Sequence, residues 1–155
     1  FNQLNLPLII VGSGPEKKQL TKIANNNISF LDYQDDLTVK KLMENCRAFV
    51  YAGTEDFGIA PVEAMASGAP IIALKKAGIL DTVNCITSKS KIPTGLLFNN
   101  QNDRDLKECI NFFEEKKLWL DFSSEDINLW SQNFSIENFK KKFSNFIDKS
   151  LSEFK

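Results

Sequence analysis

Glu55 and Glu63 flank the stretch of this chain whose residue types and spacing best suit chemistry. Pro61 lies between them, and proline is best tolerated in the first turn of a helix. We therefore predict a helix over residues 61–67, with free backbone N–H groups at its start and Glu63 in its first turn. Such a helix end binds phosphate, and Gly58 carries no side chain that would obstruct the ligand.

The two carboxylates narrow the kind of ligand that this helix end would take. Two negative charges beside an anion site would repel a bare phosphate, so they favour a ligand with hydroxyl groups, such as a sugar or a ribose. Taken alone, each glutamate has a structural explanation, Glu63 as a complement to the helix dipole and Glu55 as a surface turn residue. Only their combination with the free helix start indicates a binding site.

Composition excludes several other chemistries. The 155 residues include no histidine, which rules out Ser-His-Asp and Cys-His triads, histidine-based zinc sites and any histidine acid or base. The formal charge of -1 argues against general nucleic-acid binding, which requires a basic excess or stripe. The length suits one domain with a proper core.

The cysteines and the apolar runs bear on the location of the protein. Three widely spaced cysteines (Cys46, Cys85 and Cys109) form no CxxC motif, so we expect neither disulfides nor a cysteine zinc site, and we expect a cytoplasmic protein. No apolar run reaches the ~18 residues of a membrane span. Residues 140–142 are three lysines, most simply a solvated helix face, although peripheral membrane contact stays open.

Short apolar runs alternate with helical patterns along the first two thirds of the chain. We predict buried strands at residues 6–11, 28–31, 48–52, 69–74 and 94–98, which indicates an α/β fold of the Rossmann-like type, with a mostly parallel sheet and helices on both faces. We expect a single domain over residues 1–155, made of this core (1–98) and C-terminal helices (99–155). The last helix, from Ser135, carries a stripe of aromatic residues typical of a packing face.

Ligands of parallel sheets bind beyond the carboxyl ends of the strands, so the loops at these ends are candidate binding loops. They are residues 12–14, 32–34, 53–55 and 75–78. A further polar loop is expected at residues 87–91.

The stretch from Glu55 to Glu63, with seven residues between the acids, resembles the Glu-x7-Glu signature of the retaining glycosyltransferases of the GT-B fold, often called glycosyl transferases group 1. The sequence that follows, Glu-Ala-Met-Ala-x-Gly-x-Pro, fits the same family. So do several further stretches, namely residues 8–15, 28–33, 42–46, 94–98 and, more loosely, 134–137.

The resemblance implies a donor-binding domain for a UDP-, GDP- or ADP-sugar, with no cofactor or metal, and a separate N-terminal half that binds the acceptor. It implies that Glu55 is the catalytic residue and contacts the transferred sugar, and that Glu63 binds the ribose. By the same resemblance, the other donor-binding residues are Phe57, Gly58 and Ile59 at the sugar and phosphates, Gly12 and Gly14 beside the nucleotide, and Tyr33 and Gln34 at the base.

The sequence also departs from the family pattern. The chain opens with residues that resemble the end of a helix and runs straight into a strand, so we expect that the first strand-helix unit is missing. A basic pair that the family usually has shortly before this strand is missing too. Because the acceptor half is also absent, we expect the isolated chain to be inactive. The family's glycine pair is reduced to Ala77-Gly78, Asp81 replaces a usual glutamate, and Asp32 replaces a common glycine.

Three alternatives stay open. Gly12, Gly14 and Asp32 imitate a dinucleotide fingerprint, but Lys17 stands where the third glycine belongs, which makes NAD binding a minor alternative. Residues 103–105 match the Asp-x-Asp metal motif of another glycosyltransferase fold, although Asp103 is better explained as a helix N-cap. The chain could also be a nucleotide-binding or interaction module without turnover.

Overall fold

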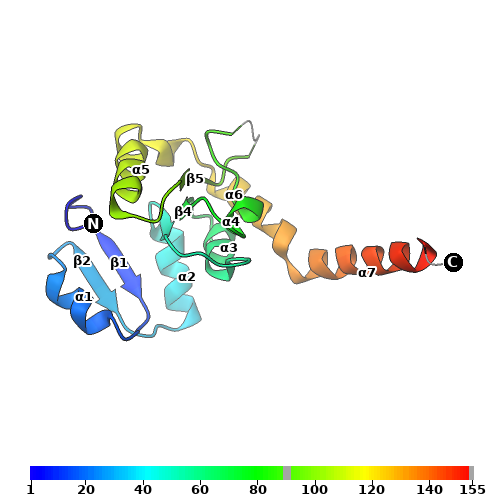
Figure 1. The fold of residues 1–155 in the computed structure, drawn as a ribbon, viewed down its shortest axis with the longest axis horizontal. Coiled ribbons are helices and arrows are strands. Elements are labelled where there is room, and N and C mark those ends of the chain that lie inside the picture. The colour runs from blue at the N-terminus through cyan, green and yellow to red at the C-terminus, as the bar shows by residue number, and fades with distance from the viewer. Residues whose placement is uncertain (89–91, 154–155) are drawn as a thin grey trace.

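A computed structural model describes residues 1–88 and 92–153 of the chain, so part of the expected polar loop at residues 87–91 lies outside the description. The body of the molecule consists of parallel strands and the helices that connect them (Figure 1). The strands are β1 (Leu8–Val11), β2 (Ile28–Leu31), β3 (Phe49–Tyr51), β4 (Ile71–Leu74) and β5 (Gly95–Phe98). The α-helices are α1 (Lys17–Ile23), α2 (Asp36–Asn45), α3 (Ile59–Ala66), α4 (Ile79–Thr82), α5 (Asp103–Glu115), α6 (Ser124–Ser131) and α7 (Ile136–Glu153). Two short 3-10 helices, η1 (Leu118–Leu120) and η2 (Gln132–Phe134), stand before and after α6.

The strands form two parallel sheets. β1 pairs with β2, and the second sheet has the order β3-β4-β5. The expected parallel α/β architecture is confirmed, but the strands do not form one continuous sheet, because no described strand pairs with the second edge of β1 or of β3.

Helices cover both faces of the three-stranded sheet, as the sequence predicted. Successive side chains of a strand point to opposite faces. On β4, Ile71 and Ala73 pack into a cluster with Met65 of α3 and Ile127 of α6. Ile72 and Leu74 pack into a second cluster on the opposite face, together with three residues of α5, which are Cys109, Ile110 and Phe113.

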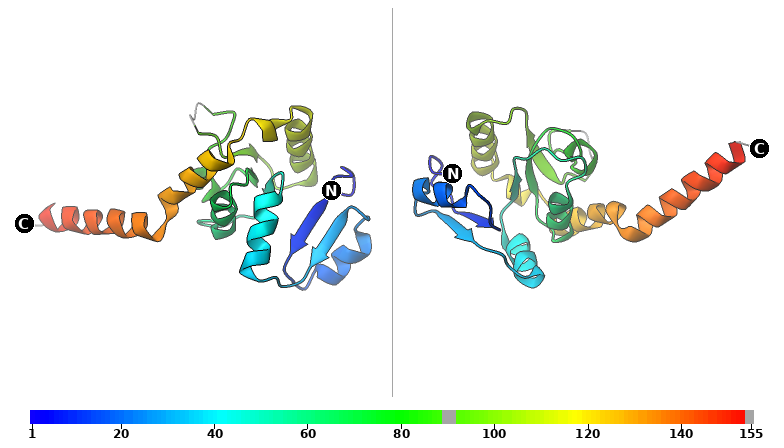
Figure 2. Two further views of the ribbon diagram at one scale, coloured as in Figure 1. Left: turned by 180° about the vertical axis from the view of Figure 1, so that it is seen from behind. Right: turned by 60° about the horizontal axis from the view of Figure 1, so that its bottom comes forward.

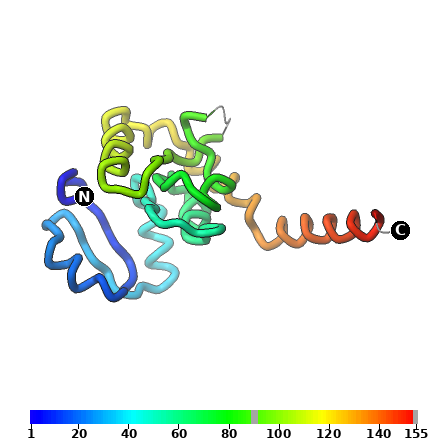
Figure 3. The backbone as a smooth tube through the Cα atoms, viewed as in Figure 1, coloured from blue at the N-terminus to red at the C-terminus, as the bar shows by residue number. Residues whose placement is uncertain are grey.

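The N-terminal segment extends this second cluster. Phe1, Leu4 and Leu6 are half-buried against it, and the side chain of Lys107 on α5 donates a hydrogen bond to Gln3. Figure 3 shows the start of the chain beside α5. This contact ties the strand pair β1-β2 to the main body.

Local capping explains where α2 and α5 begin. Asp35 caps α2 by accepting a hydrogen bond from the backbone N–H of Thr38 at 3.0 Å. The cap of α5 is Asn102, which accepts a hydrogen bond from the N–H of Asp105 at 2.7 Å, so the prediction that Asp103 is the N-cap is wrong by one residue.

The carboxylate of Asp105, the second acid of the Asp-x-Asp pattern, accepts two hydrogen bonds from Asn100. These bonds lower the pKa of Asp105 and use the second acid of the Asp-x-Asp pattern for local structure.

The last helix, α7, projects away from the body in every view (Figure 2). None of its residues is buried, and the aromatic stripe predicted there is exposed, with Phe139 64% and Phe143 54% accessible. The stripe therefore does not pack against the described part of this chain. Among the described residues, no helix combines the length and the apolar character needed to cross a bilayer.

Candidate donor-binding site

The loop between β3 and α3 carries the two glutamates of the signature. α3 begins at Ile59, two residues earlier than the sequence indicated, because Gly58 adopts a left-handed conformation (φ 82°) and serves as the N-cap. This conformation costs a residue with a Cβ about 1–2 kcal/mol, which explains the glycine. The early start moves Glu63 beyond the first turn of α3, so its predicted place in that turn is wrong.

The start of α3 offers unused hydrogen-bond donors, as predicted. In the described part of the chain, the backbone N–H groups of Gly58, Ile59 and Ala60 donate no hydrogen bond. Ile59 is 65% exposed, and Glu63, four residues later and on the same helix face, is exposed too. Ile59 and Glu63 thus share one accessible side of α3, whereas Gly58 is buried and Ala60 is half-buried.

The loop after β4 fixes the position of this site. The backbone N–H of Gly78 donates to the carbonyl oxygen of Glu55 at 3.1 Å. A Cβ built on Gly78 would lie 2.3 Å from the carbonyl oxygen of Asp56, so only glycine allows the two loops to approach so closely. Ala77 takes a left-handed conformation (φ 50°) in the same turn, at the position where the family pattern has a second glycine.

Two aromatic residues that sequence reasoning missed anchor the loop from the other side. The ring of Phe57 meets Phe134 edge to face at 5.9 Å, and Phe134 meets Trp130 at 6.2 Å. Trp130 itself donates through its indole N–H to the carbonyl oxygen of Thr82. The available signals were the four-residue spacing of Trp130 and Phe134 and the loose family resemblance of residues 134–137, and neither reveals that Phe134 meets a residue 77 positions earlier.

Tyr51, the last residue of β3, is a third residue that sequence reasoning missed. Burial, followed by hydrogen bonding to and the negative charge of Glu55, raises the pKa of Tyr51 to about 12. Its hydroxyl oxygen lies 2.9 Å from where a Cβ at Gly53 would stand, so the glycine makes room for the ring. The Tyr51 hydroxyl is therefore a partner for the carboxylate predicted to contact the sugar.

The other predicted residues form a second group at the ends of β1 and β2. Gly12 takes a positive φ of 106°, and its N–H donates to Leu31 of β2 at 3.0 Å. Space around Gly12 and Gly14 is open, with no atom within 4 Å of a built Cβ. Tyr33 is 82% exposed, and Gln34 donates to its carbonyl oxygen at 2.9 Å.

Asp32 does not stand free as a dinucleotide site would require. Its carboxylate forms an ion pair with the ammonium of Lys17, the residue that replaces the third glycine of the fingerprint. A shallow hollow of about 560 Å³ lies beside this pair and is lined by residues of α1 and the turn before it: Gly14, Pro15, Lys17, Lys18, Thr21 and Lys22. None of these lining residues belongs to the loop or the helix that carries the signature glutamates.

The structure thus gathers the predicted residues into two groups. Glu55, Phe57, Gly58, Ile59 and Glu63 belong to the loop and start of α3, and Gly12, Gly14, Tyr33 and Gln34 to the strand pair. Within residues 1–88 and 92–153, no hydrogen bond, ion pair or ring contact joins the two groups. In the same part of the chain, no three acidic, cysteine or histidine side chains converge as metal ligands.

Residues 2–128 match the model of the family described as Glycosyl transferases group 1. The chain belongs to this family. The match includes every residue of both groups and ends within α6.

Relatives of this group 1 glycosyltransferase chain are longer. It is 29% identical over 144 residues to the uncharacterized glycosyltransferase MJ1607 of Methanocaldococcus jannaschii, covering 81% of this chain and 37% of that protein. Among solved structures, sucrose-phosphate synthase from Thermosynechococcus elongatus aligns over 97% of this chain and 48% of its own, with 18% identity and a TM-score of 0.71. Anabaena Alr3699/HepE in complex with UDP-glucose aligns over 92% and 41%, with 22% identity and a TM-score of 0.69. The chain therefore spans half or less of the relatives that it matches.

Proposed function

We propose that this chain binds the nucleotide-sugar donor of a retaining glycosyltransferase. The observation that carries the proposal is the start of α3, where unused backbone N–H groups follow a left-handed Gly58 between the signature glutamates. The group 1 family match and the UDP-glucose complex of HepE support it. An open site lined by amide donors and carboxylates suits a ligand that carries both phosphates and hydroxyl groups.

Each residue has a role in this proposal. Glu63 accepts hydrogen bonds from ribose hydroxyls, Glu55 accepts them from the transferred sugar, and the amides of Phe57, Gly58 and Ile59 donate to the sugar and the phosphates. Tyr33 and Gln34 bind the base, and Gly12 and Gly14 allow the backbone to pass close to the nucleotide.

The proposed reaction keeps the anomeric configuration. The bond between the anomeric carbon and the phosphate oxygen breaks, the acceptor oxygen attacks from the same face, and the departing phosphate takes the acceptor proton. Stabilisation of the charge on the leaving diphosphate is the largest contribution that the protein makes. We propose that no resident metal takes part and that the protein works in the cytoplasm, where its three free thiols stay reduced.

Nucleotide binding by the purified chain tests the proposal. We expect UDP, GDP or ADP, or a sugar derivative of one of them, to raise the melting temperature, and NAD to leave it unchanged. Glu63→Ala should weaken nucleotide binding about tenfold, because a hydrogen bond to a charged group contributes about 1.5–3 kcal/mol. Glu115→Ala, at an exposed position on α5, is the matched control. No response to any nucleotide, or a response to NAD alone, contradicts the proposal.

Transfer is tested separately. The isolated chain should show no sugar transfer to any acceptor, since in our proposal acceptor binding belongs to a separate half. Turnover of a donor sugar by the chain alone overturns this part of the proposal. A chain that binds nucleotides while a longer form of the protein transfers no sugar favours a binding module without catalysis.

A further inference from the structure

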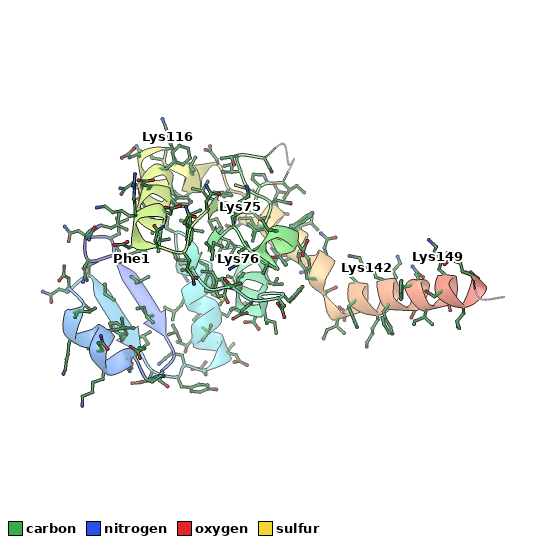
Figure 4. The ribbon with its side chains drawn as sticks, in the orientation of Figure 1. Phe1, Lys75, Lys76, Lys116, Lys142 and Lys149 are labelled. Atoms are coloured by element: carbon green, nitrogen blue, oxygen red, sulfur yellow. The ribbon has the colours of Figure 1, made fainter. Side chains whose placement is uncertain are left out.

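The loop after β4 carries two lysines that the proposed roles do not use. Lys75 and Lys76 are both exposed, and in the described residues neither side chain takes part in a hydrogen bond or ion pair. Figure 4 shows them on the body of the molecule, whereas Lys116 lies at the far end of α5 and Lys142 and Lys149 lie on the projecting α7. Two unpaired cations at the carboxyl end of a parallel strand stand where such sheets bind ligands.

Backbone contacts bring this lysine loop to the start of α3. Lys75 still belongs to the β4-β5 ladder, since its N–H donates to Phe98 at 2.8 Å. Three residues later, the backbone N–H of Gly78 donates a hydrogen bond to the carbonyl oxygen of Glu55. A Cβ built on Gly78 would lie 2.6 Å from the Cα of Phe57. Because two residues span at most about 7 Å, the Cα of Lys76 lies within that distance of Gly78. The lysine loop therefore lies next to the loop that leads into α3, and each lysine carries its ammonium group on a flexible four-carbon stem.

The acidic side chains near the start of α3 would repel an anionic ligand, so nearby cations would favour its binding. Glu55, Asp56 and Glu63 are all exposed and take part in no ion pair within the described part of the chain. A nucleoside diphosphate bound at the free amides would meet three negative charges. The amide donors of a helix start carry only partial positive charge, whereas each ammonium group on the neighbouring loop brings a full positive charge.

We propose that Lys75 and Lys76 bind the diphosphate of the nucleotide from the side opposite to the amides of α3. The inference rests on the proposed function and deepens it by assigning the cations that neutralise the leaving nucleotide. Lys76 stands closer to the fixed Gly78 and is expected to contribute more than Lys75. Both lysines bind the phosphates and leave the base and the ribose to other residues.

Binding measurements with ligands that differ only in phosphate content test this assignment. For the bases that the wild-type chain accepts, dissociation constants are measured for the nucleoside, its monophosphate and its diphosphate. We expect Lys76→Gln to weaken diphosphate binding about tenfold and the double variant Lys75→Gln/Lys76→Gln further, with nucleoside binding unchanged. Binding of the diphosphate by the wild type should weaken with added salt, and the double variant should lose part of that dependence. Lys149→Gln, at an exposed position on α7, is the matched control.

The outcomes separate this inference from the proposed function. Equal diphosphate binding by the wild type and the double variant overturns the lysine assignment and leaves nucleotide binding intact. A wild-type chain that binds none of the three diphosphates overturns both. A double variant that loses nucleoside and diphosphate binding equally shows a general effect on the site and also overturns the assignment, while Glu63→Ala reports on the ribose contact independently.

Discussion

The backbone N–H of Gly78 donates a hydrogen bond to the carbonyl oxygen of Glu55, 3.1 Å away, and this bond joins the loops after β3 and β4. Gly78 has ordinary helical dihedral angles (φ -57°, ψ -20°), so the close approach of the two backbones, and not its conformation, demands glycine. The loop that carries the signature acid is thus held by a residue that has no chemical role of its own.

Substitution of Gly78 by alanine should therefore damage both stability and binding. A Cβ only 2.3 Å from the backbone oxygen of Asp56 forces the loops apart, and such overpacking typically costs about 1–3 kcal/mol. We expect a lower urea midpoint and weaker nucleotide binding. Gly14→Ala is the control for the stability measurement alone, since no atom lies within 4 Å of a Cβ built there and the urea midpoint should not change. A Gly78→Ala variant as stable as the wild type would show that the two loops can move apart at little cost in free energy.

Substitution of Ala77 by glycine should instead raise the stability of the protein. Ala77 has a φ of 50°, a conformation that costs an L-residue about 1–2 kcal/mol and glycine almost nothing. Part of this gain is lost because glycine is more flexible in the unfolded chain, so we expect the free energy of unfolding to rise by up to about 1 kcal/mol. Ala66→Gly, on the exposed side of α3, should instead lower stability by about 0.5–1 kcal/mol.

The contact between Phe57 and Phe134 should couple the site loop to the C-terminal helices. An edge-to-face pair contributes about 0.5–1.5 kcal/mol beyond its buried area. A double-mutant cycle with Phe57→Ala and Phe134→Ala should give a coupling energy in this range from urea unfolding. The same cycle with Phe57 and Phe146, which is 64% exposed on α7, should give none. Additive effects in the first cycle would mean that the ring contact is not formed in solution.

The raised pKa of Tyr51 predicts a loss of stability at high pH. Its pKa is raised from 10.0 to about 12, first by burial and then by Glu55, so the folded protein releases this proton later than the unfolded chain. The stabilising contribution is complete below pH 10 and disappears as the pH rises from about 10 to 12. Urea unfolding across this range should show the decline, and Tyr51→Phe should remove this component.

Glu55→Gln provides the companion measurement. Without the carboxylate, the tyrosinate absorbance of Tyr51 should appear at a lower pH, because the negative charge is gone and the neutral amide oxygen of glutamine is a weaker hydrogen-bond acceptor. An unchanged titration of Tyr51 would show that its hydroxyl and Glu55 do not interact.

Local sequence signals sufficed for the five strands and for the family. Short apolar runs marked all five strands, and Gly68, with a φ of 82°, follows the end of α3 where the sequence predicted. The Glu-x7-Glu spacing led to the family that residues 2–128 confirm. These features depend on residues close together in the chain, so the sequence alone determined them.

Tertiary structure decided what holds the site. The contacts of Gly78 with Glu55 and of Phe134 with Phe57 join residues 23 and 77 positions apart, and no local pattern encodes which distant partner a residue will meet. The same is true of the division into two sheets, because strand pairing depends on which edges meet in space. The sequence therefore determined which groups are available for chemistry, and packing between distant segments decided how they are placed.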